Sequence, residues 1–432
     1  MRNLVYNQSN SRTAIKTVTL GSLTIEEPCY GTSSTAILRT HEYQPKYVRI
    51  TDFDDFGIDD DHEYMTVETY ASKHLLKAND ILFARTGGTV GKTYFYDGSI
   101  GKAVFAGYCI RFRFNESKVN PKYVYWCTKT DFYKRWINGI QRPSGQPNIN
   151  KEEYKSFEIV LPDKEYQQKL VSKMDTALKM RNSKLYDAEQ MLKIFEMNVA
   201  DIFNLESRSQ SKLCFAIKLK ELDGVIDAKR YVSLKREASE FSIRDICEIV
   251  DEKINVSRFD RQVIDWIRID DLPNHPLEIE VVRTQPADEV EGNFFEVREG
   301  DILVARLGPT ILNEKIVIVP RLERTTIASA EFLVLRCKDE YRPEAVMAVL
   351  KTAYYRDLMY SHARGSTPSR YRLNREDMLR LPFPDICEHQ EQLAIDAAQL
   401  REKVNTIRVQ AEQEWQAAKE QFEKLCWKIE NV

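Results

Sequence analysis

Residues 86–93, TGGTVGKT, are the stretch that most closely approaches a catalytic motif. They follow an apolar run typical of a strand and come near the G-x-x-x-x-G-K-[ST] pattern, whose backbone amides and lysine hold phosphate groups. However, Thr86 replaces the first glycine, and the residues after Lys92 are typical of a strand rather than of the helix that a phosphate loop requires. We therefore interpret the stretch as a basic hairpin loop, which could still contact the phosphates of DNA.

No other catalytic centre is visible in the sequence. Asp163 and Glu165 with Lys169 could be combined into a nuclease site, but they lie at a predicted helix start, where acidic residues serve as caps. The six histidines stand isolated, so neither a metal centre nor a Ser/His/Asp triad is supported. The N-P-P-[YF] box of adenine methyltransferases is missing as well. We expect a chain without catalytic chemistry of its own, and a cryptic nuclease stays an open alternative.

Two polar loops, residues 141–150 and 362–371, offer binding chemistry instead. Each combines arginine with serine, threonine, glutamine or asparagine, the side chains that donate to phosphates and read base edges. An ordinary turn-rich surface loop has the same composition, so composition alone does not decide between the two interpretations. Together with nearby strand residues, the loops supply the candidate DNA-binding residues: Arg85, Thr86, Lys92, Arg111, Arg142, Ser144, Gln146, Asn148, Arg306, Arg364, Ser366, Thr367, Arg370 and Tyr371.

The basic residues are unevenly distributed along the chain. The net charge of −3 gives no overall sign of a polyanionic partner. Between residues 101 and 151, however, there are ten lysines and arginines but only two acids, Glu116 and Asp131, which leaves a local excess of eight. Ten aromatic residues run through the same stretch, and we expect most of them in the core. The basic excess is typical of a surface that binds a phosphate backbone.

The elements that must position these residues occur twice. The strand-like segment YVRITD at residues 47–52 has a counterpart, WIRIDD, about 220 residues further along the chain. The ordered matches are 47–52 with 266–271, 79–85 with 300–306, 108–113 with 331–336, 120–126 with 341–347, and 159–163 with 381–385. Because all five keep the same order and a near-constant offset, we infer an internal duplication, the feature to settle first in any fold assignment.

Each copy is predicted to be an α/β domain followed by a long helix, which makes the chain α+β overall. Short β-branched and aromatic runs, separated by glycine-containing turns, indicate strands. One helix interrupts them, over residues 122–138 in the first copy and 343–361 in the second. A long amphipathic helix ends each copy, with Asp163 and Asp385 as candidate N-caps after a proline.

A heptad repeat runs along the first long helix and ends at Ile202. A repeat sustained over four heptads indicates a coiled-coil seam, in which Arg181 is a polar exception of the kind that fixes register at some cost in stability. The C-terminal helix has a matching stripe, which slips phase after Ala411 toward Trp415 in the manner of a stutter. The simplest partner of each helix is the other one. The expected seam residues are Val171, Met174, Leu178, Leu185, Leu192, Phe195, Val199, Leu400, Val404 and Ile407.

Length and composition set further limits. A chain of 432 residues is expected to form more than one domain, which we place at 1–162 and 207–386, with the long helices at 163–206 and 387–432. Eight single cysteines without a C-x-x-C pair are typical of reduced thiols in a cytoplasmic protein. Neither a membrane-spanning run nor a signal peptide is visible, so we expect no membrane association.

At this point the sequence resembles the specificity subunits of type I restriction-modification systems. The segments that carry the resemblance are YVRITD and WIRIDD, NDILFARTGGTVGK and GDILVARLGP, SGQPNIN, and IVLPDKEYQQKLV and LPFPDICEHQEQL. The resemblance covers essentially the whole chain in its two-copy order, and it is specific in combination although each motif is weak alone. The second copy departs from the pattern because GSTPSRYRL replaces the loop that carries Gln-Pro-Asn-Ile, which leaves open which of its residues meet DNA.

The resemblance implies two target-recognition domains, each reading one half of a split sequence in double-stranded DNA. It implies that the two long helices form an antiparallel coiled coil and that two modification subunits, which carry S-adenosylmethionine, bind the chain. It also implies that restriction subunits, which use ATP and Mg²⁺, join the complex, while this chain holds no cofactor. A non-catalytic coiled-coil scaffold that binds protein partners is the alternative; it explains the helices and the duplication but not the basic excess.

Overall fold

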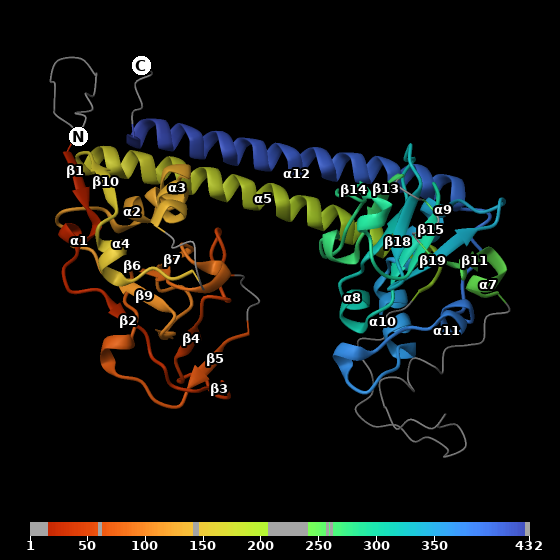
Figure 1. Cartoon of the computed structure of the whole chain (residues 1–432), viewed down its shortest axis with the longest axis horizontal. Helices are drawn as coiled ribbons and strands as arrows, with labels where there is room; N and C mark the ends of the chain where they lie inside the picture. The colour runs from red at the N-terminus through yellow and green to blue at the C-terminus, as the bar shows by residue number, and fades with distance from the viewer. Residues whose placement is uncertain are drawn as a thin grey trace. The chain divides into compact units, whose positions relative to one another are not determined.

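The computed structural model describes residues 16–58, 63–140, 147–205, 241–255, 259 and 262–427. The chain divides into two compact units. Two long helices, α5 (Lys164–Ile202) and α12 (Gln390–Trp427), contribute one half to each of them (Figure 1). The predicted α+β class and the long helix after each copy are confirmed. The units are Met1–Lys184 with Val409–Val432, called unit 1, and Leu185–Arg408, called unit 2.

A four-stranded antiparallel sheet with the order β2-β9-β6-β7 forms the centre of unit 1. Its strands are β2 (Cys29–Tyr30), β9 (Cys109–Phe112), β6 (Asp80–Ala84) and β7 (Thr93–Tyr96). β6 is buried along its whole length, which accounts for its almost continuous apolar sequence. The paired strands outside this sheet are β1 (Lys16–Thr19) with β10 (Glu158–Leu161), β3 (Ala36–Leu38) with β5 (Met65–Val67), and β4 (Lys46–Val48) with β8 (Ala103–Phe105).

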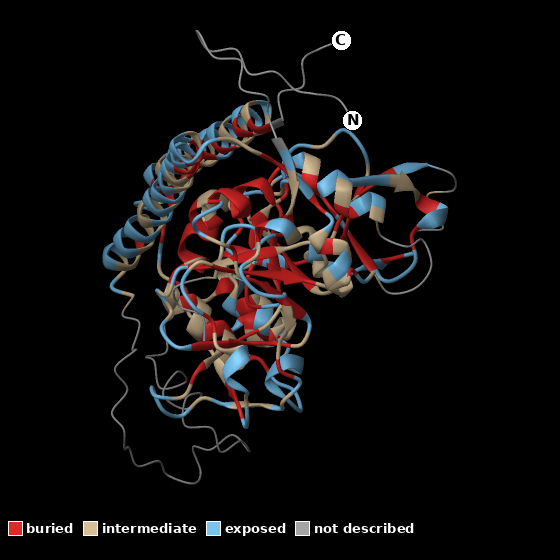
Figure 2. Ribbon diagram, turned by 90° about the vertical axis from the view of Figure 1, so that its left-hand side faces the viewer, coloured by how far each residue is buried: buried red, intermediate tan, exposed pale blue. Residues whose placement is uncertain are grey.

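Short helices complete unit 1 and pack with the long helices around an aromatic core. In Figure 2 the buried residues gather in the globular parts, whereas the long helices carry mostly exposed and intermediate ones. Tyr123 and Trp126 are buried and share one cluster with Trp415 and Phe422 of α12. The expectation that most rings of residues 101–151 lie in the core is confirmed; Tyr108 is the exposed exception. The helices are α1 (Leu20–Leu23), η1 (Ser72–His74), η2 (Gly87–Thr89), α2 (Pro121–Cys127), α3 (Asp131–Ile140) and α4 (Lys151–Lys155).

Unit 2 repeats the central sheet of unit 1 and differs in the strands outside it. Its four-stranded sheet has the order β11-β19-β16-β17, the same as the central sheet of unit 1. The parallel pair of β4 with β8 also has a counterpart, β13 with β18, which here belongs to a five-stranded sheet. The strands are β11 (Cys247–Ile249), β12 (Lys253–Ile254), β13 (Val263–Ile267), β14 (Arg283–Pro286), β15 (Phe294–Val297), β16 (Ile302–Ala305), β17 (Ile316–Ile318), β18 (Thr326–Ser329) and β19 (Phe332–Cys337).

The single helix predicted within each copy is two helices. In unit 1, α2 and α3 are separated at residues 128–130. There the Thr130 hydroxyl donates to the Cys127 carbonyl and accepts from the Tyr133 amide, so it closes one helix and opens the next. The helices of unit 2 are α7 (Ile243–Ile246), η5 (Ile269–Asp271), η6 (Ala287–Glu289), α8 (Gly308–Leu312), α9 (Pro343–Leu350), α10 (Ala353–His362), η7 (Pro368–Arg370) and α11 (Arg375–Leu379).

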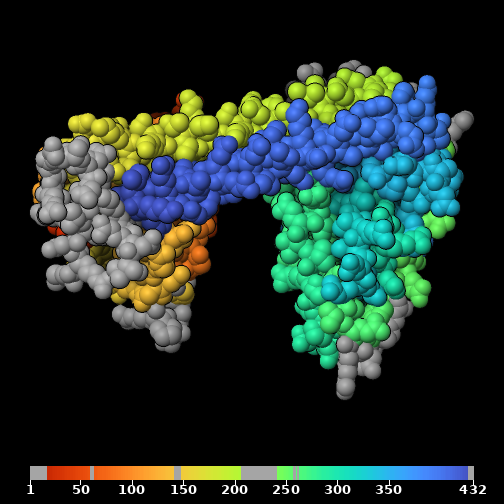
Figure 3. Space-filling model, turned by 90° about the horizontal axis from the view of Figure 1, so that it is seen from above, coloured from red at the N-terminus to blue at the C-terminus, as the bar shows by residue number. Residues whose placement is uncertain are grey.

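The long helices run antiparallel and side by side within each unit (Figure 3). In unit 1, Arg181 of α5 forms an ion pair with Glu412 of α12 at 3.0 Å, and its guanidinium lies over the Phe56 ring at 3.7 Å. These two contacts satisfy the polar residue of the heptad. Among the expected seam residues, Val171, Met174, Val199 and Val404 are buried, and Leu178, Leu185, Leu192, Phe195, Leu400 and Ile407 are intermediate.

The structure shows why the predicted seam stops before Ile202 on α5 and changes phase after Ala411 on α12. Ile202 is 43% exposed, so the seam stops before it. The phase slip of α12 turns Trp415 toward the domain core of unit 1, where its ring lies 5.8 Å from that of Trp126. Beyond Ala411, α12 therefore packs against a globular domain as well as against α5. Among the described residues, no helix combines the length and the apolar character needed to cross a membrane.

Candidate nucleic-acid interface

The described residues of the two candidate loops, 147–150 and 362–371, lie beside the ends of equivalent strands. In unit 1 the chain after β6 pairs with residues 147–149 of the first loop, because the Gly87 amide donates to the Pro147 carbonyl at 3.1 Å and the Ile149 amide donates to the Arg85 carbonyl at 2.9 Å. The Arg85 amide donates in turn to the Tyr108 carbonyl at 2.9 Å. We call this edge, formed by Arg85, Thr86, Tyr108 and Asn148, the unit 1 rim.

Unit 2 makes the same three hydrogen bonds. The Gly308 amide donates to the Tyr371 carbonyl at 2.8 Å, and the Leu373 amide donates to the Arg306 carbonyl at 2.9 Å. The Arg306 amide donates to the Glu331 carbonyl at 3.1 Å. The duplication thus reproduces the backbone of the binding edge as well as that of the sheet. We call the equivalent edge, formed by Arg306, Leu307, Glu331 and Arg372, the unit 2 rim.

Each rim is anchored by the short helix that follows the loop. The Asn150 side chain caps α4 and forms a reciprocal capping box with Glu153, while the Asn374 side chain accepts from the Asp377 amide at 2.8 Å at the start of α11. In unit 1 the Tyr154 hydroxyl also donates to the Ala84 carbonyl at 2.7 Å and ties α4 to the end of β6. These contacts hold the rim backbones on rigid elements, which suits a surface that must read a fixed pattern.

The unit 1 rim carries positive charge without an acidic partner. The Arg85 guanidinium lies over the Tyr30 ring at 4.7 Å, and its Nε donates to Asn148 Oδ1 at 3.3 Å. Lys92 follows the turn, and among the described residues no carboxylate forms an ion pair with either cation. Because paired cations lose much of their attraction for phosphate, these two are the best placed in unit 1 to contact a DNA backbone.

The loop between them is not a nucleotide-binding loop. Residues 87–89 form a three-residue 3₁₀ turn, and β7 begins directly after Lys92, as the sequence indicated. Gly91 has a φ of +88°, and an added Cβ would lie 3.0 Å from the Ile137 side chain, so the tight turn requires glycine there. A hairpin of this kind presents no helix N-terminus to a phosphate chain.

The unit 2 rim is partly neutralised. Arg372 forms two hydrogen bonds with the Glu331 carboxylate, from Nε at 3.2 Å and from Nη2 at 3.1 Å. Arg364 lies 3.6 Å from Asp377, and the pair is a looser one. Arg370 is exposed and has no carboxylate partner among the described residues. Of the remaining candidates, Ser366 and Thr367 are exposed, Tyr371 is half-buried against the Tyr360 ring, and Arg306 is half-buried with a buried Nε.

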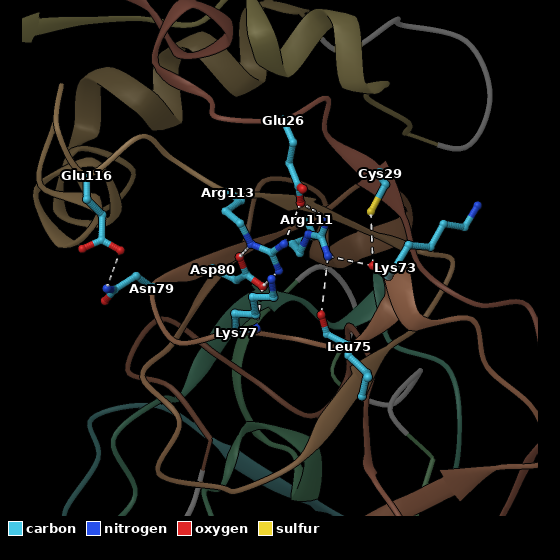
Figure 4. Close-up of polar contacts among 10 residues, drawn as sticks. All are labelled: Glu26, Cys29, Lys73, Leu75, Lys77, Asn79, Asp80, Arg111, Arg113 and Glu116. Carbon is cyan, nitrogen blue, oxygen red and sulfur yellow. Dashed lines mark hydrogen bonds and ion pairs between the residues drawn. The ribbon is translucent and has the colours of Figure 1, made fainter.

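Arg111 does not belong to the interface, contrary to the prediction from sequence. It is 4% exposed, pairs with Glu26 and donates to the Lys73 carbonyl at 2.7 Å (Figure 4). The neighbouring Arg113 makes two 2.7 Å bonds to the buried Asp80 carboxylate, so these groups form one internal network. In unit 2, Arg336 makes the same two-pronged contact with the buried Asp301 at 2.8 Å. From the sequence we predicted that Arg111 lies on a basic surface, whereas its position on strand β9 of the central sheet buries it within unit 1.

Most of the basic excess between residues 101 and 151 is likewise neutralised within unit 1. Except for Asp131, the acids lie outside residues 101–151, so a count over that window cannot include them. The pairs are Arg111 and Arg113 with Glu26, Arg113 with Asp80, Lys122 with Asp175, Lys129 with Asp55, Lys134 with Asp131, Arg135 with Glu423 and Lys151 with Glu27. The excess is therefore not evidence of a continuous DNA-binding patch.

Four residues of the rims were missed by the sequence reasoning, namely Tyr108 in unit 1 and Leu307, Glu331 and Arg372 in unit 2. Tyr108 is 62% exposed and Glu331 occupies the same position in unit 2. The duplication already aligned residues 108–113 with 331–336, so this pairing was the available signal. The candidates Arg142, Ser144 and Gln146 lie outside the described residues. Within the described parts of the chain, no group of three or more histidine, cysteine or acidic side chains is placed to hold a metal ion.

Comparisons with known proteins point to one family. Residues 32–185 match the type I restriction modification DNA specificity domain, a segment that contains the unit 1 rim and the first half of α5. No curated protein matches the chain.

Three solved structures align with nearly the whole chain. A chain solved in work on complex assembly and conformational transition of the type I R-M system is 14% identical, with a TM-score of 0.48 over 95% of both chains. The HsdS subunit from Thermoanaerobacter tengcongensis is 14% identical, with a TM-score of 0.35 over 95% of this chain and 96% of that one. The type I restriction-modification S subunit from M. genitalium is 11% identical, with a TM-score of 0.45 over 97% and 98%.

The second half of the chain, which the family model does not match, is structurally equivalent to the first. Unit 2 has the same strand order, the same buried arginine–aspartate pair and the same rim hydrogen bonds as the unit that contains the matched segment. Residues 32–185 are therefore similar to a type I restriction modification DNA specificity domain, and unit 2 has a central sheet and a rim equivalent to those of unit 1.

Proposed function

We propose that the chain reads a bipartite DNA target, with the unit 1 rim facing one half-site and the unit 2 rim facing the other. The observation that supports this most strongly is the repeated rim. The same backbone frame occurs twice, while its side chains differ between the units. A duplicated frame with different side chains is what two readers of different half-sites require, because phosphate contacts position a protein and base-edge contacts specify the sequence.

The long helices would set the distance between the half-sites. α5 is continuous over 39 residues, which at 1.5 Å per residue gives about 58 Å. The other helix, α12, has 38 residues and pairs with it in the antiparallel sense. A paired helix of that length resists bending far better than a loop of the same number of residues. We therefore propose that the unspecific gap in the target depends on the length of this pair.

Catalysis would lie in partner subunits. In this proposal two modification subunits bind the chain, and their S-adenosylmethionine supplies the methyl group for an adenine that is flipped out of the duplex. Restriction subunits with ATP and Mg²⁺ would join the same complex in the cytoplasm. This chain binds, orients and selects the DNA and moves no chemical group itself.

A coiled-coil scaffold for protein partners is the competing function. The basic excess no longer separates the two, because most of those charges are paired within unit 1. The rims and their immediate neighbours do distinguish the two functions. The unit 1 rim carries Arg85 with an amide and hydroxyl side chains, and Lys92 and Arg370 lie in the chain segments next to the rims. A protein-docking surface is expected to have an apolar centre instead.

Co-expression with a methyltransferase chain tests the proposal. The two chains should co-purify, and sequencing of methylated adenines in a host without other adenine methylation should give one motif with two defined halves. Methyltransferase activity that needs this chain but follows a single undivided motif would contradict the bipartite reading. A stable complex that leaves DNA unmethylated and binds no duplex would favour the scaffold.

A further inference from the structure

The two rims differ in the two side chains that flank the equivalent arginines Arg85 and Arg306. Tyr108 of unit 1 and Glu331 of unit 2 occupy one position, because the carbonyl oxygen of each accepts a hydrogen bond from the amide of that arginine. Asn148 and Arg372 occupy the other, because each is bridged to the next residue, Thr86 in unit 1 and Leu307 in unit 2. The backbone is the same, so any difference in what the rims bind must arise from side chains.

In unit 2 the flanking side chains are Glu331 and Arg372, and their arrangement leaves arginine donors that match the acceptors of guanine. Glu331 occupies Nε and Nη2 on one edge of the Arg372 guanidinium. The opposite edge, with Nη1 and the second hydrogen of Nη2, stays available for the guanine O6 and N7 acceptors. The carboxylate also cancels the charge of the arginine and would repel a phosphate, which favours a base contact over a backbone contact. Both side chains are accessible, at 47% for Arg372 and 37% for Glu331.

In unit 1 one side chain, Arg85, is suited to a phosphate contact and another, Asn148, to a base contact. Arg85 has no carboxylate partner among the described residues and keeps its charge for phosphate. Asn148 is exposed, and an asparagine amide can donate to N7 and accept from N6 of adenine. Its Oδ1 accepts from Arg85 Nε at 3.3 Å, which orients the amide and still leaves a lone pair for a base. Tyr108 offers an exposed ring and hydroxyl beside it.

We propose that these flanking pairs determine one base pair in each half-site. Glu331 with Arg372 selects a G·C pair, and Tyr108 with Asn148 selects an A·T pair. The inference rests on the proposed function, since it assigns specificity to the same rims. A good bidentate contact discriminates against a wrong base by about tenfold to a hundredfold, which is large enough to appear in a methylation motif.

Exchange of the pairs tests the proposal in the assembled methyltransferase complex. The variant E331Y/R372N places the unit 1 pair in unit 2, and Y108E/N148R does the reverse. Each should change the preferred base at one position of one half-site, by tenfold or more, and leave the other half-site unaltered. The readout is the methylation motif, together with selection of bound duplexes from a randomised pool. The matched control is R342N/E391Y, an exposed arginine–glutamate pair of unit 2 at the start of α9 and α12, which should leave the motif unaltered.

A single, nearly isosteric variant distinguishes a change in base preference from a loss of folding. E331Q keeps the shape of the pair but removes the charge, and it should relax the preference at the same single position while the melting temperature of the complex stays within the range of the control. Unaltered base preferences at every position in folded E331Q and E331Y/R372N would overturn the proposal. The proposed function would survive that result, because it fails only if the unsubstituted complex itself shows no bipartite motif.

Discussion

Replacing Arg85, Lys92 and Arg111 one at a time separates DNA contact from internal structure. Each phosphate contact contributes about −0.9 to the slope of log binding constant against log salt concentration. Loss of one contact should therefore remove about 3.5-fold of the affinity change between 50 and 200 mM salt. We expect that loss in Arg85→Ala and in Lys92→Ala, since no described carboxylate neutralises either cation.

Arg111→Met should behave differently, because Arg111 is 4% exposed and its charge is used by Glu26. Its salt slope should stay unaltered, whereas the free energy of unfolding should fall by about 3 kcal/mol, as expected when one partner of a buried ion pair is removed. The assay is fluorescence anisotropy of a labelled duplex over a salt series, with thermal unfolding in parallel. The reasoning is refuted if a folded Arg111→Met variant loses the same slope as Arg85→Ala.

Three further predictions concern the long helices, the buried Asp80 and the buried Lys129. A seven-residue insertion in both α5 and α12 adds about 10 Å, which corresponds to roughly three base pairs at 3.4 Å each. The unspecific gap in the methylation motif should lengthen by that amount. An unaltered gap would contradict the proposal that the length of the helix pair sets the gap. Asp80→Asn should lower the free energy of unfolding by about 3–5 kcal/mol in denaturant titrations, because it removes the buried carboxylate that makes two hydrogen bonds with Arg113 and leaves the more exposed Glu26 as its charge partner; a loss under 1 kcal/mol would show that the buried pair is dispensable. Burial lowers the pKa of Lys129 to about 8, so the unfolded chain binds more protons between pH 8 and 10 and stability should rise with pH over that window; Lys129→Met should flatten this rise, and identical pH profiles would contradict the assignment.

The duplication was readable from the sequence because both copies keep their apolar strands and their order. The segments 79–85 and 300–306 became β6 and β16 at the centres of equivalent sheets. The heptad likewise indicated a paired helix, because a seven-residue repeat leaves an apolar stripe that only another surface can cover. The prediction that the two candidate loops occupy the same place in the two copies agrees with the described residues, because 147–149 and 371–373 make equivalent hydrogen bonds.

Features that depend on contacts between distant residues were out of reach. Glu26, Asp80 and Glu423 neutralise cations that the sequence placed on a basic surface, and each acid lies well away from its partner in the chain. The break between α2 and α3 depends on how the Thr130 hydroxyl is used, which an apolar pattern does not record. Tyr108 looked like one more core aromatic, because exposure of a single ring on a turn leaves no periodic signal.

The caps at the starts of α3 and α10 also depend on residues that are distant in the sequence. In unit 1, Glu423 of α12 accepts hydrogen bonds from the Asp131 and Phe132 amides and so caps α3. In unit 2, Glu196 of α5 accepts from the Ala353 amide and caps the equivalent helix α10. Each long helix therefore caps a helix of the copy to which it does not belong in sequence. The sequence analysis does not identify either cap, because nothing within one copy indicates the helix to be capped.

Exchange of whole domains tests the central claim most directly. Residues 1–162 or 207–386 are replaced by the corresponding segment of another specificity subunit with a known target, and methylated adenines are mapped for each complex. Our account predicts that each exchange replaces one half of the motif and leaves the other half and the gap unaltered. A change in both halves from a single exchange, or in neither, would contradict the claim that each unit reads its own half of the target.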